Sequence, residues 1–223
     1  MKIIKNDNKL ILPLRDQEKF LWFYDWLGDF PKHWDVKRGK FLFRNGKELN
    51  DDLKCDLILS LTLNGVMHKE DLEARSLVPS DYSTYQIFYP NDLVFKLIDL
   101  ENYQTSRVGI VSEKGIMSSA YIRLVPNKNL NSKFFYYYYY SLYVQGIYNF
   151  MGMGVRASLN YSDLLNIPVL VPPIGEQEKI VNYLDNALNE IQEFESHVGA
   201  KFSITKKYKA SLIYSAVTGK IKI

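Results

Sequence analysis

The chain has 223 residues, of which 47% are hydrophobic, so it can bury one substantial core, and one globular domain with a helical extension suits this length. Its single cysteine, Cys55, excludes an internal disulfide framework and a multi-cysteine zinc site, which fits a reducing compartment. The net charge of +3 and the isoelectric point near 8.7 permit nucleic-acid binding without establishing it. The sequence shows neither a signal peptide nor an apolar run near the roughly eighteen residues of a membrane span, so we expect a cytoplasmic protein.

Residues 1–30 are predicted to form an N-terminal helical segment. Apolar side chains between Phe20 and Leu27 follow Asp16 at helical spacing, and Pro31 ends the segment. This segment would therefore lead into a separate folded domain.

The chain from Trp34 to about Pro126 is typical of a sheet-rich domain. Turn sequences such as Asn45-Gly46 and Asn64-Gly65 separate short runs of β-forming residues. Residues 133–150 are predicted to form a helix packed on that sheet, and most of its five consecutive tyrosines would pack, because they point all ways round the helix. The predicted strands are Phe41–Phe43, Leu57–Leu63, Tyr85–Tyr89, Leu93–Ile98, Val108–Val111 and Ala120–Val125.

The C-terminal part is predicted to be one long amphipathic helix. A strand-like run, Ile167–Val171, and two prolines lead into about forty proline-free residues, with Gly175 as N-cap and Glu178 as the acidic half of a capping box. At about 1.5 Å per residue this helix would span roughly 60 to 65 Å, with local unwinding near Gly199. Its apolar residues recur at intervals of four and three, which marks a coiled-coil seam that requires a partner helix. The predicted seam comprises Ile180, Leu184, Ala187, Ile191, Phe194, Val198, Phe202 and Leu212.

Several segments together resemble a known family. They are Pro31–Trp34, Tyr85–Phe95, Gly109–Ser112, Ser119–Tyr121, Gly154–Tyr161, Ile167–Gln177 and Ala216–Lys220. The most specific part is the double proline followed by Glu-Gln, the heptad helix and the Val-Thr-Gly-Lys end, in that order and spacing. Over residues from about 31 to 223, the chain resembles the specificity (S) subunit of type I restriction-modification systems.

The resemblance implies an α+β protein in three parts. These are the N-terminal helical segment 1–30, a sheet-rich target recognition domain 31–174, and a long helix 175–223 that acts as a spacer and pairs as an antiparallel coiled coil. A typical S subunit has two recognition domains and two such helices, whereas this chain has one of each. The resemblance therefore implies a half-subunit whose second copy completes the bilobed reader of a palindromic bipartite site.

The resemblance also implies the partners. Such a subunit binds double-stranded DNA, performs no chemistry, and directs methyltransferase (M) and restriction (R) subunits to the site. This chain would bind no cofactor itself, and S-adenosylmethionine, ATP and Mg²⁺ are expected on the partner subunits.

The DNA-contacting residues can be narrowed by chemistry and position. Arg and Lys suit guanine, Asn and Gln suit adenine, and phosphates attract any Lys, Arg or Ser. Loops of the sheet-rich domain offer such groups, and each could equally be a solvated surface residue. For the last two residues of the list, a loop pinned against the core is the favoured reading. The candidates are Arg44, Asn45, Lys47, His68, Lys69, Arg75, Asn102, Gln104, Ser106, Arg107, Arg156 and Asn160.

A self-contained DNA-modifying enzyme is the alternative, and a coiled-coil protein without DNA function is a third possibility. Phe150–Gly154 imitates the glycine loop of methyltransferases, but Val171–Ile174 lacks the polar first residue and the aromatic fourth residue of their catalytic tetrad. For a metal-dependent nuclease, Asp35 with Asp52 and Lys54 is the nearest approximation. The histidines lack metal-ligand spacing, so we predict neither a catalytic nor a metal site.

Overall fold

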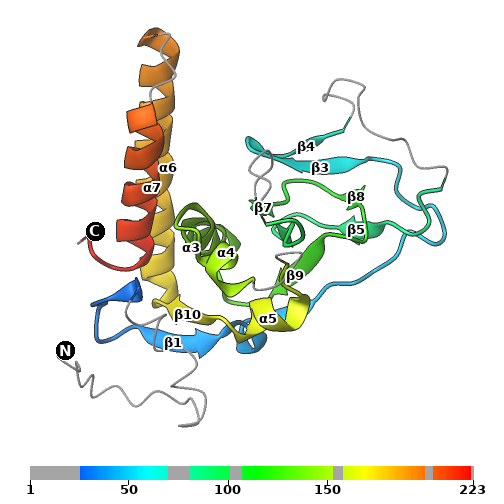
Figure 1. Ribbon diagram of the computed structural model, residues 1–223, viewed down its shortest axis with the longest axis horizontal. Coiled ribbons are helices and arrows are strands. Elements are labelled where there is room, and N and C mark those ends of the chain that lie inside the picture. The colour runs from blue at the N-terminus through cyan, green and yellow to red at the C-terminus, as the bar shows by residue number, and fades with distance from the viewer. Residues whose placement is uncertain (1–25, 70–80, 101–106, 153–157, 199–202, 222–223) are drawn as a thin grey trace.

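The computed structural model describes residues 26–69, 81–100, 107–152, 158–198 and 203–221. A sheet-rich domain and a pair of long helices stand side by side, and two strands, β1 and β10, run along the base between them (Figure 1). Only residues 26–30 of the predicted N-terminal helical segment are described, and residues 26 and 27 are helical.

A four-stranded antiparallel sheet forms the centre of the sheet-rich domain, in the order β2, β9, β6, β7. Because side chains alternate along a strand, the two faces of β6 enter different cores. Leu93 and Phe95 enter the main core, and Val94 enters a second, smaller one. The sheet is therefore covered on both faces. Its strands are β2 (Phe43–Asn45), β9 (Ile122–Pro126), β6 (Leu93–Phe95) and β7 (Val108–Ile110).

The remaining strands form three antiparallel pairs. They are β3 (Leu59–Thr62) with β4 (Gly65–His68), β5 (Gln86–Phe88) with β8 (Gly115–Met117), and β1 (Asp35–Arg38) with β10 (Pro168–Val171).

Most of the predicted strands are confirmed. The strand predicted at Phe41–Phe43 is wrong by two residues, because a 3-10 turn, η2 (Gly39–Phe41), comes first and β2 begins only at Phe43. Sequence patterns missed β1, β4 and β8, which are three or four residues long and carry glycine or charged residues at strand positions.

The helix predicted over residues 133–150 is present as two helices, α3 (Ser132–Val144) and α4 (Ile147–Met151). Asn131 caps α3 by accepting hydrogen bonds from two backbone amides, and Gly146, with φ of +73°, separates α3 from α4. The tyrosine run packs as predicted. Tyr138 and Tyr139 are fully buried, and the ring of Tyr139 meets that of Phe95 edge to face at 5.1 Å.

The C-terminal helix is not a single rod of 60 to 65 Å. It forms two helices, α6 (Ile174–Val198) and α7 (Ser203–Val217), which lie side by side (Figure 1), and Lys209 of α7 pairs with Glu195 of α6 at 2.6 Å. At 25 residues, α6 is about 37 Å long. Folding back buries Leu212 and Ala216, which a lone rod would leave in water. Gly199, near which local unwinding was predicted, lies outside the described residues.

The predicted seam is therefore divided between the chain's own core and the surface. Ile180 and Leu184 are buried in the main core rather than offered to a partner, because α6 packs against α3 and α7 of the same chain. Ala187 and Ile191 pack at the edge of the core, and Leu212 is buried from the α7 side. Phe194 is 62% exposed. Val198 ends α6, and Phe202 lies outside the described residues.

The Glu-Gln motif after the double proline joins α6 to the sheet-rich domain, and we name this contact the α6 joint. The Glu176 carboxylate accepts hydrogen bonds from His33 Nε2 and Trp34 Nε1, each at 2.8 Å. Gln177 is 2% exposed; its amide donates to the Pro172 carbonyl and its Oε1 accepts from the backbone N–H of Asn131 at the start of α3. The joint therefore fixes how α6 leaves the domain.

The Val-Thr-Gly-Lys segment at the end of α7 packs against Pro31 and Trp34, next to the α6 joint. Gly219 has φ of +71°, and a Cβ at this position would collide with the ring of Pro31 and approach Trp34. The two segments that carry most of the family resemblance thus meet around the entry to the sheet-rich domain, and both have a structural role.

Arg107 corrects one prediction of a DNA contact. Its side chain is 1% exposed, and its guanidinium donates to the carbonyls of Ile98 at 3.1 Å and Asp99 at 2.7 Å. The chain leaves the sheet after β6, and the buried guanidinium of Arg107 bonds the carbonyls of the two residues there, Ile98 and Asp99. In this position it cannot reach a nucleic acid.

We expect Arg107→Ala to lower the free energy of unfolding by about 2 to 4 kcal/mol, because the large buried side chain is lost together with its hydrogen bonds to two carbonyls. Urea denaturation followed by tryptophan fluorescence measures the change. Arg44→Ala, which removes an exposed arginine from β2, is the matched control and should leave stability within about 0.5 kcal/mol. Equal effects of the two substitutions would contradict the structural role of Arg107.

The α6 joint should weaken in acid. Partial burial opposes ionisation of Glu176, but the hydrogen bonds from Trp34 and His33 outweigh it and hold its pKa below the ordinary 4.5. A carboxylate with a lowered pKa contributes stability above the unfolded pKa, and this contribution is lost as pH falls through the folded pKa. Glu176→Gln should therefore be less stable than the wild type at neutral pH, and the difference should shrink as pH falls below about 4.5.

Urea midpoints between about pH 6 and pH 3 measure this difference. The control is Glu178→Gln, an exposed carboxylate of the same helical turn. A gap between wild type and Glu176→Gln that stays constant over this range would show that the joint does not depend on the ionised carboxylate.

Candidate nucleic-acid interface

Three predicted DNA-contacting residues lie close together in the segment formed by the last two residues of β2 and the three that follow, which we name the β2 turn (residues 44–48). Phe43 enters the main core, and Arg44, next along the strand, is exposed on the other face of the sheet. Asn45 and Lys47 are also exposed, and the Asn45 side chain accepts a hydrogen bond from the Lys47 backbone N–H at 3.1 Å. The turn therefore presents two cations and an amide to solvent.

A buried ion pair lies directly beneath this turn. Arg123 of β9 is 6% exposed, and its Nε donates to the carboxylate of Asp92, which is 3% exposed. The same guanidinium donates to the carbonyl of Gly46. Burial raises the pKa of Asp92, and the backbone N–H of Tyr89 and the Arg123 guanidinium oppose that rise.

Sequence reasoning missed this pair. Two features of the sequence could have indicated it: Arg123 is a charged residue in the middle of the predicted strand Ala120–Val125, and Asp92 lies in the turn sequence Pro90-Asn91-Asp92. A lone charge inside a strand is uncommon unless it is paired.

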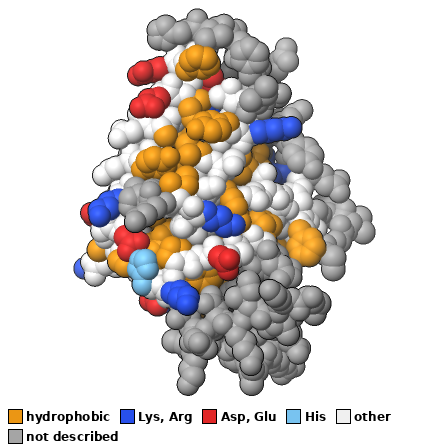
Figure 2. Space-filling view, turned by 90° about the vertical axis from the view of Figure 1, so that its left-hand side faces the viewer, with side chains coloured by type: hydrophobic (Ala, Val, Ile, Leu, Met, Phe, Trp, Pro, Cys, Tyr) orange, Lys and Arg blue, Asp and Glu red, His pale blue; other side chains and the backbone are white. Residues whose placement is uncertain are grey.

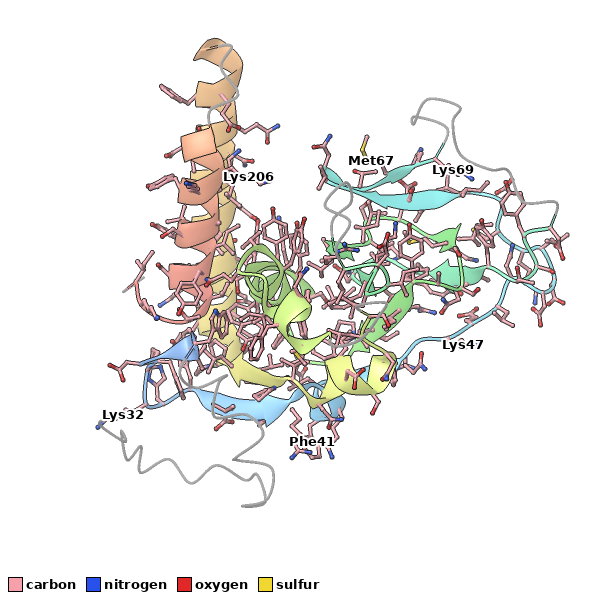
Figure 3. All side chains as sticks on the ribbon, in the orientation of Figure 1. Lys32, Phe41, Lys47, Met67, Lys69 and Lys206 are labelled. Atoms are coloured by element: carbon pink, nitrogen blue, oxygen red, sulfur yellow. The ribbon has the colours of Figure 1, made fainter. Side chains whose placement is uncertain are left out.

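The other described candidates lie elsewhere. His68 and Lys69 come at the end of β4, where His68 Nε2 is 2.6 Å from a carboxylate oxygen of Glu113. Figure 3 shows Lys69 and Lys47 well apart, with strands of the domain between them. The structure therefore does not bring the two groups into one surface.

Asn160 is a helix cap. Its side chain accepts a hydrogen bond from the Asp163 N–H, and the Asp163 carboxylate accepts from the Asn160 N–H, so the two close a capping box at the start of α5 (Tyr161–Asn166). Asn160 thus has a structural role as an exposed helix cap, and not as part of a loop pinned against the core. Arg75, Asn102, Gln104, Ser106 and Arg156 lie outside the described residues.

The residues weighed for a nuclease are surface ion pairs. Asp35 pairs with Lys37 of the same strand at 3.0 Å, and Asp52 pairs with Lys54, two residues further along the chain. Within the described ranges, His, Cys, Asp and Glu nowhere form a group of three that could hold a metal ion. None of the helices in the same ranges is both long enough and apolar enough to cross a membrane.

Comparison with solved structures gives related folds. A chain from a study of complex assembly and conformational transition of the type I R-M system aligns with 93% of this chain and 54% of its own length, with a TM-score of 0.51 and 16% identity. The HsdS subunit from Thermoanaerobacter tengcongensis aligns with 93% of this chain and 53% of its own length, with a TM-score of 0.48 and 16% identity. The chain thus spans about half the length of these solved chains.

Comparison with curated proteins gives no match. A family description, the type I restriction modification DNA specificity domain, matches residues 28–198, from the entry into the sheet-rich domain to the end of α6. Because this match covers well over half of the chain, the protein belongs to the family of type I restriction-modification DNA specificity domains.

Proposed function

We propose that this chain is a half-length, sequence-specific DNA-recognition subunit of a type I restriction-modification complex. The observation that carries the proposal is the match to the DNA specificity domain over residues 28–198, in a chain about half as long as the solved chains that share its fold. On this proposal the chain has no catalytic residues of its own. It directs an M subunit and an R subunit to DNA, and S-adenosylmethionine, ATP and Mg²⁺ bind to those partners.

The β2 turn supports a DNA contact on chemical grounds. Arg44 can form two hydrogen bonds with guanine, Asn45 can do so with adenine, and Lys47 can neutralise a phosphate. The turn is exposed and is held from below by the buried Arg123 and Asp92. Exposed side chains on a rigid support are the arrangement that direct reading of bases requires.

An apolar face on the helical hairpin supports pairing with a second copy. Tyr183 and Phe194 are eleven residues apart on α6, about three turns, and are 36% and 62% exposed. Tyr208 of α7 is 57% exposed and lies at the level of Phe194, because its neighbour Lys209 pairs with Glu195. Figure 2 shows apolar side chains gathered along this face, with charged groups at its borders and a few among them in its lower half.

A second copy is the occupant we propose for this face, with the two sets of helices antiparallel about a twofold axis. The chain has about half the length of the solved chains, so two copies would restore their size. Identical readers on a twofold axis recognise a split palindrome, and the paired helices would set the distance between its halves.

Lys47→Ala should weaken DNA binding by this chain. Loss of one phosphate contact should reduce the slope of log K against log salt by about 1 and lower affinity on most sequences. Fluorescence anisotropy with labelled duplexes at several salt concentrations measures both quantities.

The matched control is Lys206→Ala. Lys206 is an exposed lysine on α7, away from the sheet-rich domain (Figure 3), and its removal causes the same change in net charge. If both substitutions weaken binding equally, the effect comes from net charge and the β2 turn is not the contact.

Phe194→Asp should convert a dimer into a monomer. A buried charge in the paired helices should weaken association by about 2 kcal/mol or more, which is roughly thirty-fold. Light scattering over a range of concentrations measures the mass, and circular dichroism checks that the exposed site tolerates the change.

Asn182→Asp is the control for this substitution. Asn182 is exposed on the same helix, but it points about 100° away from the neighbouring Tyr183. A wild-type chain that stays monomeric at high concentration would contradict the proposed second copy.

A further inference from the structure

We propose that Arg123 is a positioning residue for DNA recognition, which fixes the β2 turn in the one conformation that reads bases. This inference rests on the proposed function and names the group on which its sequence preference depends. Arg123 does not touch the nucleic acid in this account. It acts through the backbone of Gly46 and through the side chains that surround its guanidinium.

The first step of the argument is the double hold on Gly46. The Gly46 N–H donates to the backbone carbonyl of Arg123 at 3.4 Å, and the Gly46 carbonyl accepts from the Arg123 guanidinium. A single residue of β9 thus satisfies both polar backbone groups of Gly46. The neighbouring Asn45 and Lys47 are held in place through their shared backbone.

The second step is the fit of the guanidinium. Its Nε donates to Asp92, and its plane stands over the ring of Tyr89, with 5.0 Å from Cζ to the ring centroid. The Tyr89 hydroxyl donates to Glu48 at 3.0 Å, and the other Glu48 oxygen is 3.6 Å from the guanidinium. Glu48, the last residue of the β2 turn, therefore belongs to the same cluster. Only the planar guanidinium, with its several N–H donors in fixed directions, can contact Asp92, Gly46 and Glu48 at once.

The third step is the close packing around Gly46, which leaves no space for a side chain. A Cβ on Gly46 would lie 2.5 Å from Cγ2 of Val125 and 2.6 Å from Nε of Arg123. The turn therefore rests directly on the β9 side chains and has no second position within its present contacts. Such close packing removes conformational freedom before binding, which lowers the entropic cost of making base contacts.

The consequence separates recognition from affinity. Without the Arg123 fork the exposed cations of the β2 turn remain, so attraction to phosphates remains. Base contacts depend on geometry and would be lost first. Loss of Arg123 should therefore reduce the preference for one sequence and leave the salt dependence of binding unchanged.

The test uses the full chain and Arg123→Lys, which keeps the charge opposite Asp92 and removes the fork. Selection from a randomised duplex pool first defines the sequence that the wild type prefers. Affinity for that duplex and for a scrambled one is then measured at several salt concentrations. We expect the preference to fall roughly ten-fold, the expected size for the loss of one good base contact, with no change in salt slope.

Two further variants keep the result interpretable. Gly46→Ala places a methyl group against Val125 and Arg123 and displaces the turn without removing the guanidinium, and it should lose preference as Arg123→Lys does. Leu124→Val, which trims the opposite, core-facing side of β9, should retain preference at a similar loss of stability. Hydrogen exchange adds a readout without DNA: the Ile87 N–H, which donates to the Glu48 carbonyl at 2.8 Å, should exchange faster in Arg123→Lys.

Each outcome has one meaning. If Arg123→Lys keeps the preference of the wild type, the positioning role is overturned, and a salt slope lowered by about 1 would overturn it in favour of a direct phosphate contact. A wild-type chain that binds all duplexes equally would instead contradict the proposed function, and with it the role of Arg123 in recognition.

Discussion

The buried side chain of Gln177 is the contact on which the arrangement of the two parts depends. It hydrogen-bonds to the segment before α6 and to the start of α3, while the adjacent Glu176 holds the indole of Trp34. Because buried amides are costly to leave unpaired, the helix cannot rotate or tilt without breaking these bonds. The proposed role of α6 in setting the distance between two DNA-reading domains requires a fixed exit of this kind, since a flexible joint would allow many distances.

The helical hairpin resolves a conflict within the sequence. A regular apolar seam runs along a segment too long for the domain to cover, and a single helix would leave much of it in water. Folding α7 back onto α6 covers Leu184 and Leu212, and leaves Tyr183, Phe194 and Tyr208 as the exposed remainder. The face proposed for a second copy thus keeps only Phe194 of the predicted seam, because Ile180, Leu184 and Leu212 are buried within the chain.

Sequence patterns predicted the elements better than the roles of single residues. Periodicity and turn residues located most strands, the tyrosine helix and α6, because these signals are local. Arg107 and Lys47 looked alike in the sequence, as cations in polar loops, yet one is buried beneath carbonyls and the other is exposed. That difference depends on which distant carbonyls lack a partner, and no local pattern records it. Glu176 likewise looked like a helix-start residue, whereas its partners His33 and Trp34 lie more than 140 residues away in sequence.

The two buried arginines suggest how a recognition domain can combine variable loops with a constant frame. Arg107 and Arg123 both bring a charge inside the sheet-rich domain and direct it at backbone carbonyls of connecting segments. Such a bond does not involve the exposed side chains of the segment, so these can differ while the support stays, although Gly46 itself has no room for a side chain. Exposed side chains on these segments can then change without loss of the frame. Under the proposed function, the buried Arg123 would determine where a base-reading side chain lies, and the exposed residues of the β2 turn would determine which base it reads.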